Sequence, residues 1–182
     1  MRIYYNSGGN EFEISPEVEQ VFARYRQHLP WQAERGGLLF ADFAAPLGQA
    51  VRIIRATPPN YRDKSTRTSL LLDPRRCCRE VRSANHEGFW FIGYWHTHPE
   101  PHPIISDLDI AAFYSNLETR NSGIDALLAI IVSSTGAVEN HSYYLFRRNA
   151  DEVPAKLTLR RACRSAPGTN IPPSAYTRLD GC

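Results

Sequence analysis

The sequence has no long hydrophobic run, and this limits the kind of protein it can be. Its longest apolar run, residues 126–132, is far shorter than the roughly 20 residues that a membrane-spanning helix needs. The first ten residues contain no apolar segment of the length that a signal peptide requires. We therefore expect a soluble, cytoplasmic protein with no membrane partner.

Cysteine is scarce and lacks the spacing of a metal or redox site. The chain has 4 cysteines, at Cys77, Cys78, Cys163 and Cys182, and no Cys-x-x-Cys. That pattern excludes a zinc deaminase, which requires Pro-Cys-x-x-Cys, and it favours reduced thiols over a disulfide framework. We predict that Cys77 and Cys78 occupy core and surface positions of one helix.

Excess charge is also absent. The net charge is +2, and 42% hydrophobic with 22% charged residues is the composition of a globular domain rather than a disordered chain. Arginines cluster only on one probable helix, at Arg75, Arg76, Arg79 and Arg82, a spacing that is typical of a solvated helix face. We therefore predict no nucleic-acid partner.

Helix and strand patterns alternate along the chain. Ser15-Pro16-Glu17 has the cap, proline and early acid of a helix start, and an apolar stripe runs from Val18 to Leu29 before Pro30. Asp73-Pro74 starts a second helix that reaches about residue 86. Ser106 opens a third helix, whose expected core face is Leu108, Ala111, Ala112 and Leu117. Strands are predicted at 2–5, 38–41, 49–57, 69–72, 89–95, 126–133 and 141–146.

This alternation indicates an α/β (α+β) fold, with a mixed central β-sheet flanked by helices. The pattern weakens after about residue 155, and prolines and glycines are frequent after residue 165. We expect a single domain over residues 1–155 and a flexible C-terminal extension over residues 156–182.

One stretch, from His96 to Asp109, has the spacing of a metal site. Side chains two apart on a strand point the same way, so His96 and His98 can present two imidazoles to one ion. A stiff turn with three prolines follows, and it allows Asp109, on the first turn of the next helix, to return as a third ligand. Two histidines and a carboxylate leave a fourth position for water, which is the ligand set of an open, hydrolytic Zn²⁺ site with one zinc per chain.

Ser106 has two interpretations. Ser106-x-x-Asp109 before a helical pattern resembles a capping box, in which the serine caps the helix and the acid only interacts with its dipole. In the metal interpretation the serine lies beside the site, and it can serve both purposes. His102, in the turn, is assigned to the surface because an open site does not need it.

Between Tyr61 and Thr68 the chain is polar and basic, with Arg62, Lys64 and Arg67. Such a loop is a candidate for gripping an extended substrate tail beside the zinc, and a solvated surface loop is an equally simple interpretation.

These residues resemble the JAMM (MPN+) metalloprotease motif: His96-Thr97-His98-Pro99, the seven-residue spacer, Ser106 and Asp109, with Glu34 ahead of Gly36-Gly37-Leu38. The resemblance covers about residues 18–146. It implies a JAB-like MPN fold and cleavage of isopeptide or peptide bonds at the C-terminal tail of ubiquitin-like proteins. It also implies that His96, His98 and Asp109 bind zinc, that Glu34 is the general acid and base, and that Ser106 helps to hold the oxyanion. Ala41 departs from the family, which often has glycine there.

A narrower resemblance is to short bacterial isopeptidases of CBASS anti-phage systems, which remove a cGAS-like nucleotidyltransferase from the proteins to which it is conjugated. Two alternatives are a non-catalytic MPN scaffold and a peptidase that matures a ubiquitin-like or sulfur-carrier protein. A related bacterial branch linked to DNA repair usually has His-Asn-His-Pro-Ser-Gly, whereas this chain has His-Thr-His-Pro-Glu-Pro.

Overall fold

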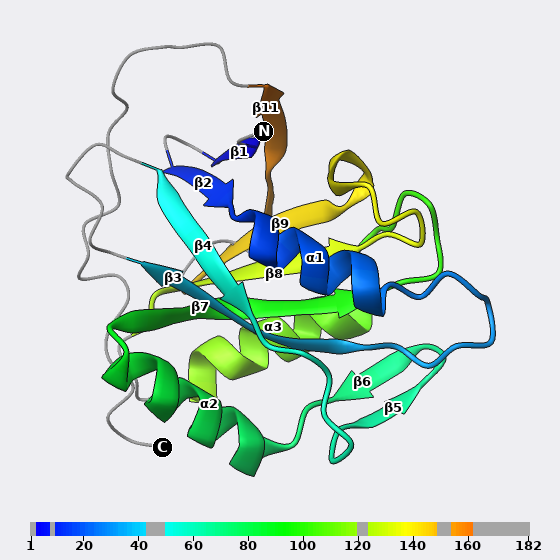
Figure 1. Ribbon diagram of the computed structural model, residues 1–182, viewed down its shortest axis with the longest axis horizontal. Coiled ribbons are helices and arrows are strands. Elements are labelled where there is room, and N and C mark those ends of the chain that lie inside the picture. Colours follow the sequence, from blue (N-terminus) through cyan, green and yellow to red (C-terminus); the bar gives the residue numbers. More distant parts are fainter. Residues whose placement is uncertain (1–2, 8–9, 43–49, 120–123, 149–153, 162–182) are drawn as a thin grey trace.

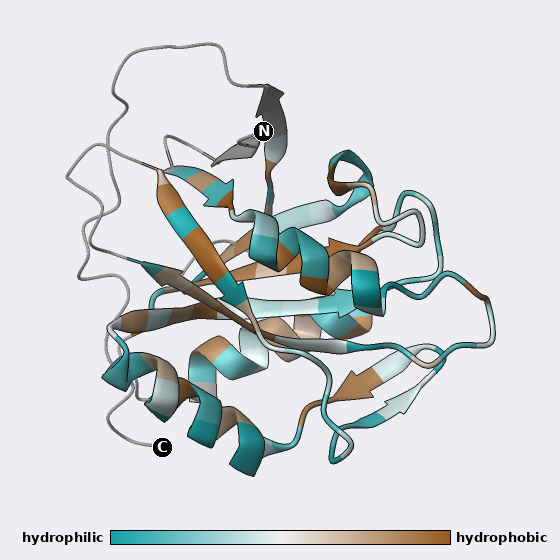
Figure 2. Ribbon diagram, in the orientation of Figure 1, coloured by the Kyte–Doolittle hydropathy of each residue, from teal (hydrophilic) through white to brown (hydrophobic). Residues whose placement is uncertain are grey.

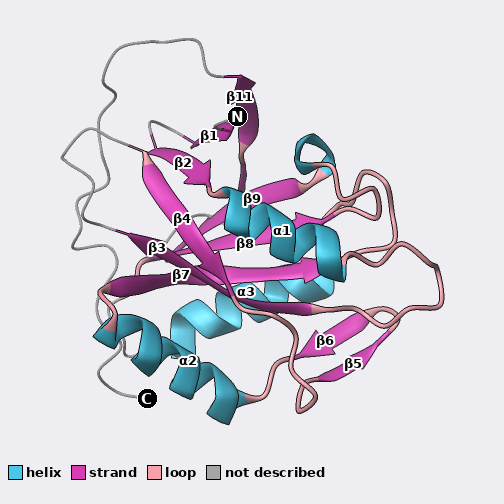
Figure 3. Cartoon of the chain, viewed as in Figure 1, coloured by secondary structure: helices cyan, strands magenta, loops and turns pink. Residues whose placement is uncertain are grey.

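The computed structural model describes residues 3–7, 10–42, 50–119, 124–148 and 154–161. The main sheet contains β1 (Ile3–Ser7), β2 (Asn10–Ile14), β3 (Gly36–Asp42), β4 (Val51–Ala56), β7 (Phe89–Thr97), β8 (Ala126–Val132), β9 (Ser142–Arg147), β10 (Ala155–Lys156) and β11 (Thr158–Arg161). The strand order is β10-β9-β8-β7-β3-β4-β2-β1-β11, and the sheet is curled and mixed (Figure 3). Only the β2–β4 and β7–β8 pairs are parallel.

Three α-helices lie in the described part of the chain: α1 (Pro16–Tyr25), α2 (Pro74–His86) and α3 (Asp107–Thr119). A separate hairpin of β5 (Lys64–Thr66) and β6 (Ser69–Leu71) projects beside the main sheet (Figure 1). A short 3-10 helix, η1 (Val138–Asn140), precedes β9. The predicted mixed sheet with flanking helices is confirmed, and no described helix has the length and apolar character to cross a bilayer.

Helices cover both faces of the sheet, and strand β8 shows why. Every residue of β8 is buried, and alternate side chains enter two separate cores. Val18 and Phe22 of α1 pack in one core, whereas Cys77 of α2 and Phe113 of α3 pack in the other. Figure 2 shows the same pattern, with hydrophobic central strands between helices whose outer faces are hydrophilic. A strand buried on both faces forms a rigid centre, and β7, which carries the first histidine, lies directly beside it.

The predicted helix starts at residues 16 and 74 are confirmed, but two details of the helices differ. Helix α1 ends at Tyr25, four residues before Leu29, and Gln27 is buried there with hydrogen bonds to two neighbouring loops. The core face of α3 was predicted only in part: Leu117 is buried as expected, but Leu108 is 67% exposed, and Ala111 and Ala112 are exposed as well. Phe113, which was not predicted, is buried with Leu117. Phe113 stacks on Phe146, with ring centroids 4.6 Å apart, and this contact rotates Leu108 towards solvent.

The sheet continues past residue 155, where we expected the domain to end. Strand β10 pairs with β9, and β11 pairs with β1, so residues 156 and 158–161 belong to the folded sheet. The rest of the predicted tail, residues 162–182 with Cys163 and Cys182, lies outside the described residues. The basic segment at 61–68 is also more ordered than expected, because it contains strand β5.

Candidate metal centre

Strand β7 brings the first histidine to the end of the sheet, and the chain places the second directly after it. His96 pairs with Gly36 on β3 and with Ile131 on β8, so its backbone is held on both sides. His98 follows the strand, and its N–H donates to the Val132 carbonyl at 3.1 Å. Gly36 permits this close approach, because a Cβ there would lie 2.4 Å from the Trp95 carbonyl oxygen and 3.1 Å from His96 Cβ.

Three ligand-type side chains converge at this point. The Nε2 atoms of His96 and His98 lie 3.2 Å apart. One carboxylate oxygen of Asp109 lies 3.5 Å from His96 Nε2, and the other lies 3.6 Å from His98 Nε2. Ligands about 2.0–2.1 Å from a tetrahedral Zn²⁺ are about 3.3–3.5 Å from one another. The donor set and its spacing therefore fit one metal ion held by His96, His98 and Asp109.

Ser106 forms a complete capping box with Asp109 at the start of α3. The Ser106 N–H donates to Asp109 Oδ2 at 3.1 Å, and the Asp109 N–H donates to Ser106 Oγ at 3.2 Å. The Ser106 hydroxyl also donates to Asp109 Oδ2 at 2.5 Å. The helix-cap interpretation is thus confirmed, and the same contact fixes the carboxylate beside the histidines. Ser106 is exposed, so its hydroxyl lies at the open side of the group.

Glu34 lies beside His98, two residues before the start of β3. Its Oε1 is 4.0 Å from His98 Nε2, and its side chain is only 6% exposed. The Glu34 N–H donates to the Thr66 carbonyl of the hairpin at 2.8 Å, so the hairpin holds this residue by its backbone. Glu34 is about sixty residues from the histidines in the sequence. The β3–β7 pairing and the Arg35–Thr97 hydrogen bonds bring them together.

The two carboxylates have opposite electrostatics. Burial raises the pKa of Glu34 to about 7, and the charges of Asp109 and Glu100 add to the rise, whereas His98 opposes it. Burial also raises the pKa of Asp109, but hydrogen bonds from His96, His98 and Ser106 outweigh it and hold that pKa far below its usual range. Asp109 is therefore an anion suited to binding a cation, and Glu34 is poised to exchange a proton near neutral pH.

His98 is held between acids. Burial lowers the pKa of its imidazole, but Asp109, Glu34 and Glu100 together raise it above the usual value. Glu100 Oε2 lies 3.7 Å from His98 Nδ1, on the opposite side of the ring from Asp109. A carboxylate on the second nitrogen of a metal-binding histidine orients the ring. Nothing in the sequence pattern indicates this contact of Glu100.

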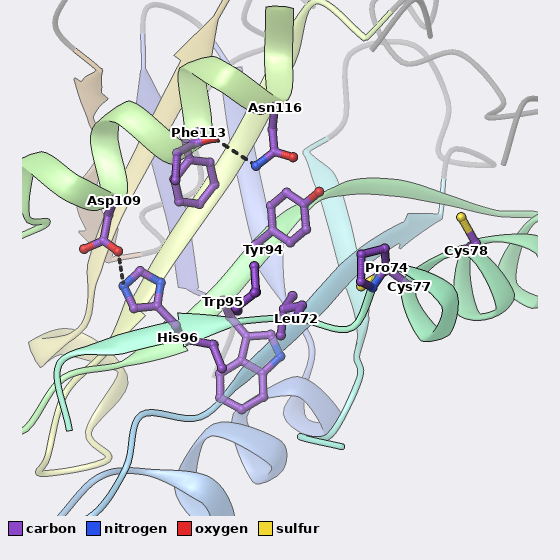
Figure 4. Close-up of a pocket in the computed structure, with 13 residues that line it drawn as sticks. Leu72, Pro74, Cys77, Cys78, Tyr94, Trp95, His96, Asp109, Phe113 and Asn116 are labelled. Atoms are coloured by element: carbon purple, nitrogen blue, oxygen red, sulfur yellow. Dashed lines mark hydrogen bonds and ion pairs between the residues drawn. The ribbon is translucent and has the colours of Figure 1, made fainter. Parts of the chain in front are cut away.

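A mostly apolar cavity of about 340 Å³ opens beside the metal ligands (Figure 4). His96 and Asp109 line one end of it, and Figure 4 shows Pro74 and Cys77 of α2 at the other. Its remaining walls come from β6, β7 and α3, with Leu70, Leu71, Leu72, Tyr94, Trp95, Ala112, Phe113 and Asn116. Concave, apolar sites with a few polar groups at one end are typical of ligand binding.

The hairpin carries the predicted basic residues close to Glu34. Lys64 begins β5, Arg67 lies in the turn after it, and Arg62 lies in the loop before it; all three are exposed. No ion pair with an acid joins these three side chains to another described residue. The Thr66–Glu34 hydrogen bond joins this basic segment to Glu34 through the backbone. A role of the three cations in substrate binding stays a prediction.

Gln27 is a supporting residue that the sequence did not reveal. Its side-chain nitrogen donates to the carbonyls of Gln32 and Arg67, at 2.6 and 3.1 Å. Its carbonyl oxygen accepts from the hydroxyl of Thr97, the buried residue between the two histidines. A lone glutamine after a helical stripe gives no sequence signal of this kind. Gln27 nevertheless links α1, the hairpin and β7 at the site.

The other candidate residues lie where they were expected or outside the site. His102 is exposed, and Cys77 and Cys78 are buried and half-buried on α2. His141, which had no predicted role, is buried: its Nδ1 accepts the Ser133 N–H at 3.1 Å, and its Nε2 has no hydrogen-bond partner among the described residues. Burial lowers the pKa of His141 to about 4.

Comparison with known proteins bears on the fold alone. No protein-family model matches the sequence, and no curated protein matches it. The chain is similar to the solution structure of protein DSY2949 from Desulfitobacterium hafniense, with a TM-score of 0.53 and 21% sequence identity. The match covers 81% of this chain and 88% of that chain, so the likeness extends over most of both folds.

Proposed function

We propose that this protein is a JAMM-type zinc isopeptidase or peptidase with an MPN-like fold. The observation that carries the proposal is the convergence of His96, His98 and Asp109, with the buried Glu34 carboxylate 4.0 Å from His98. Two imidazoles, one carboxylate and a nearby proton-transfer group are the components of an open hydrolytic site, whereas a structural zinc site closes with a fourth protein ligand.

In the proposed reaction the chain's own residues position the substrate and move a proton. When bound by His96, His98 and Asp109, zinc lowers the pKa of water and polarises the carbonyl under attack. Glu34 accepts the proton of the attacking water and passes it to the leaving amine, a task that its pKa of about 7 suits at neutral pH. The Ser106 hydroxyl turns from Asp109 Oδ2, to which it donates in this structure, and donates to the developing oxyanion instead, a contribution worth about a hundredfold or more in rate.

Three features favour an extended protein tail as the substrate. The apolar cavity begins at His96 and Asp109, so a side chain bound there lies next to the reacting bond. Exposed cations line the hairpin at Arg62, Lys64 and Arg67 and can contact a tail or its attached protein. Large hydrophobic side chains are exposed on the segments around the site and can contact a protein substrate: Trp31, Tyr61, Leu71, Ile104 and Leu108.

The biological context that we propose is reversal of conjugation in a CBASS anti-phage system, with a cGAS-like nucleotidyltransferase as the conjugated protein. The resemblance of His96 to Asp109 to the short bacterial isopeptidases supports it. Maturation of a ubiquitin-like or sulfur-carrier protein requires the same chemistry on a linear peptide bond. The identity of the cleaved conjugate distinguishes the two.

The experiment begins with the proteins encoded beside this one. Their C-terminal tails are fused to a reporter protein, through both a peptide bond and a lysine isopeptide bond, and are incubated with zinc-loaded protein before intact-mass measurement. We expect cleavage directly after the tail, and we expect Glu34→Ala to lower the rate about 10²–10⁴-fold while zinc content stays at one per chain.

The matched control is Glu87→Ala, which removes an exposed carboxylate at the C-cap of α2. We expect its cleavage rate to equal that of the wild type. Cleavage that survives Glu34→Ala overturns the proposed mechanism. Failure of the purified protein to bind stoichiometric zinc favours the non-catalytic scaffold instead.

A further inference from the structure

A buried ion pair lies outside the metal centre, between helix α2 and the loop before β5. Arg76 and Asp63 have side chains that are only 1% and 4% exposed. The guanidinium Nε and Nη2 of Arg76 donate to the two carboxylate oxygens of Asp63, both at 3.0 Å. Charges of this kind are costly to bury unless every donor and acceptor is satisfied.

Every donor of the guanidinium has a partner. Besides Asp63, it donates through Nη1 to Glu80 at 2.6 Å and to Thr57 Oγ1 at 3.1 Å, and through Nη2 to the Gly36 carbonyl at 3.3 Å. A guanidinium has five N–H groups in a fixed plane, so these bonds fix its position fully. The positions of the end of β4 and the start of β3 are thereby tied to α2.

The acid is equally well satisfied. Asp63 also accepts the backbone N–H groups of Asn60 at 2.8 Å and Asp73 at 2.9 Å. The first bond shapes the loop before the hairpin, and the second holds the N-terminus of α2. Burial raises the pKa of Asp63, but the bonds from Arg76 and the two backbone groups hold it below its usual value. The pair thus joins four segments of the chain.

Two of those segments hold Glu34. Gly36, whose carbonyl contacts Arg76, lies two residues after Glu34 and pairs with His96. Lys64, which directly follows Asp63, begins the strand whose Thr66 carbonyl accepts the Glu34 N–H. The ion pair also anchors the cavity walls on α2 and β6. Asp73, whose N–H donates to Asp63, lies between the end of β6 and the start of α2.

We propose that the Arg76–Asp63 pair is a positioning unit that fixes Glu34 and the hairpin wall of the cavity relative to the metal ligands. This inference rests on the proposed function for its catalytic consequence. Stability alone does not account for such a pair, since a buried ion pair can often be replaced by apolar side chains at no net cost to folding. A role in orienting Glu34 does account for the pair, because a displacement of about 1 Å in a reacting group can cost about a hundredfold in rate.

Two conservative variants test the positioning role of the pair. Amide hydrogen exchange measures how firmly Glu34 and the hairpin are held, and it needs no substrate. Asp63→Asn removes one charge, and Arg76→Lys keeps the charge but cannot form the planar, five-donor arrangement. We expect both to speed amide exchange at Glu34 and across β5 and β6 by about tenfold or more, while the amides of β8 and β9 keep their wild-type rates. Glu87→Gln, which breaks the exposed Arg55–Glu87 pair, is the matched control and should change none of these rates.

The catalytic readout uses the tail fusion that the wild type cleaves. We expect a fall of about tenfold or more in kcat for both variants, with one zinc per chain retained, and no change for Glu87→Gln. Unchanged exchange at Glu34 in both variants overturns the proposal, as does an equal acceleration in β8 and β9, which would show general destabilisation. Absence of cleavage by the wild type overturns the proposed function separately, because the exchange measurement does not depend on it.

Discussion

At the scale of single residues, the candidate site gives two neighbouring carboxyl groups different environments. The carboxylate of Asp109 lies 3.5 and 3.6 Å from two imidazole nitrogens and accepts a hydrogen bond from the Ser106 hydroxyl, and these contacts stabilise its anion. Glu34 is buried with no comparable donors, which destabilises its anion and raises its pKa to about 7. One carboxylate therefore suits metal binding and the other suits proton transfer, and the difference arises from surroundings rather than residue type.

Asp109→Asn tests the metal assignment at this scale. The substitution keeps the size of the side chain and removes the charge that faces both imidazoles. Because even the loss of an outer-shell partner weakens metal binding about 10–100-fold, we expect the loss of this ligand to raise the zinc Kd by about a hundredfold or more. Competition with a chromophoric chelator measures it. Asp107→Asn, exposed two residues earlier on α3, is the control and should bind zinc normally.

Ser106→Ala tests the double role of the serine. The loss of the capping hydroxyl should lower the free energy of unfolding by about 1 kcal/mol, measured by urea denaturation of the zinc-free protein. In the proposed reaction it should also lower kcat by about a hundredfold. Ser106→Thr retains the hydroxyl and should keep most of the wild-type free energy of unfolding and most of the wild-type kcat. Equal kcat values for the alanine variant and the wild type would limit Ser106 to helix capping.

At the scale of elements, the site is assembled from residues at the ends of strands and helices. Strand β7 ends one residue after the first histidine, α3 begins at the capping box, and the hairpin of β5 and β6 supports Glu34. The hairpin is a small unit joined to the main sheet through side chains and a few backbone bonds, so its surface can vary without disturbing the core. In the proposed function, substrate selection is therefore expected to depend on this hairpin.

Charge reversal on the hairpin tests that expectation. Replacing Arg62, Lys64 and Arg67 by glutamate should raise KM for the natural tail by at least about tenfold and leave zinc binding intact, because these side chains are exposed and do not contact the ligands. The control reverses three exposed arginines of α2, Arg75, Arg79 and Arg82, and should leave KM unchanged. If the hairpin variant cleaves as well as the wild type, the basic residues have no part in substrate binding.

At the scale of the whole molecule, two hydrophobic cores on opposite faces of one sheet support the strands that carry the site. His141 lies in this interior, against the ring of Phe22 on α1, with centroids 5.7 Å apart. Its imidazole is buried in the neutral form, because burial lowers its pKa to about 4 from an ordinary value of about 6.5. The unfolded chain therefore binds a proton at a pH at which the folded protein does not.

The consequence is a loss of stability in acid. Between pH 6.5 and about 4 the unfolded state is protonated at His141 and the folded state is not, so the free energy of unfolding falls as the pH falls. From pH 7 to pH 5 we expect His141 to account for about 2 kcal/mol. His141→Gln should reduce the pH dependence by that amount, measured by urea denaturation of zinc-free protein at both pH values. Identical pH dependence in the two proteins would contradict the buried neutral histidine.

Local sequence patterns predicted much of the architecture. Proline after a capping residue identified the starts of α1 and α2, and apolar runs identified β7, β8 and β9, because these signals act over a few residues. The buried face of α3 was not predictable in this way. Leu108 and Phe113 are both hydrophobic, and the ring of Phe146, distant in sequence, determines which one is buried.

The stretch that ends β7 and begins α3 was determined by the sequence itself, since the spacing of His96, His98, Ser106 and Asp109 brings them together through one strand end, one turn and one helix cap. The surroundings of that stretch were decided by the tertiary structure. The raised pKa of Glu34, the Gln27 contacts and the Arg76–Asp63 pair all depend on burial and on hydrogen bonds between segments far apart in the chain. Desolvation and long-range pairing are properties of the packed fold, and a local pattern of residues does not specify them.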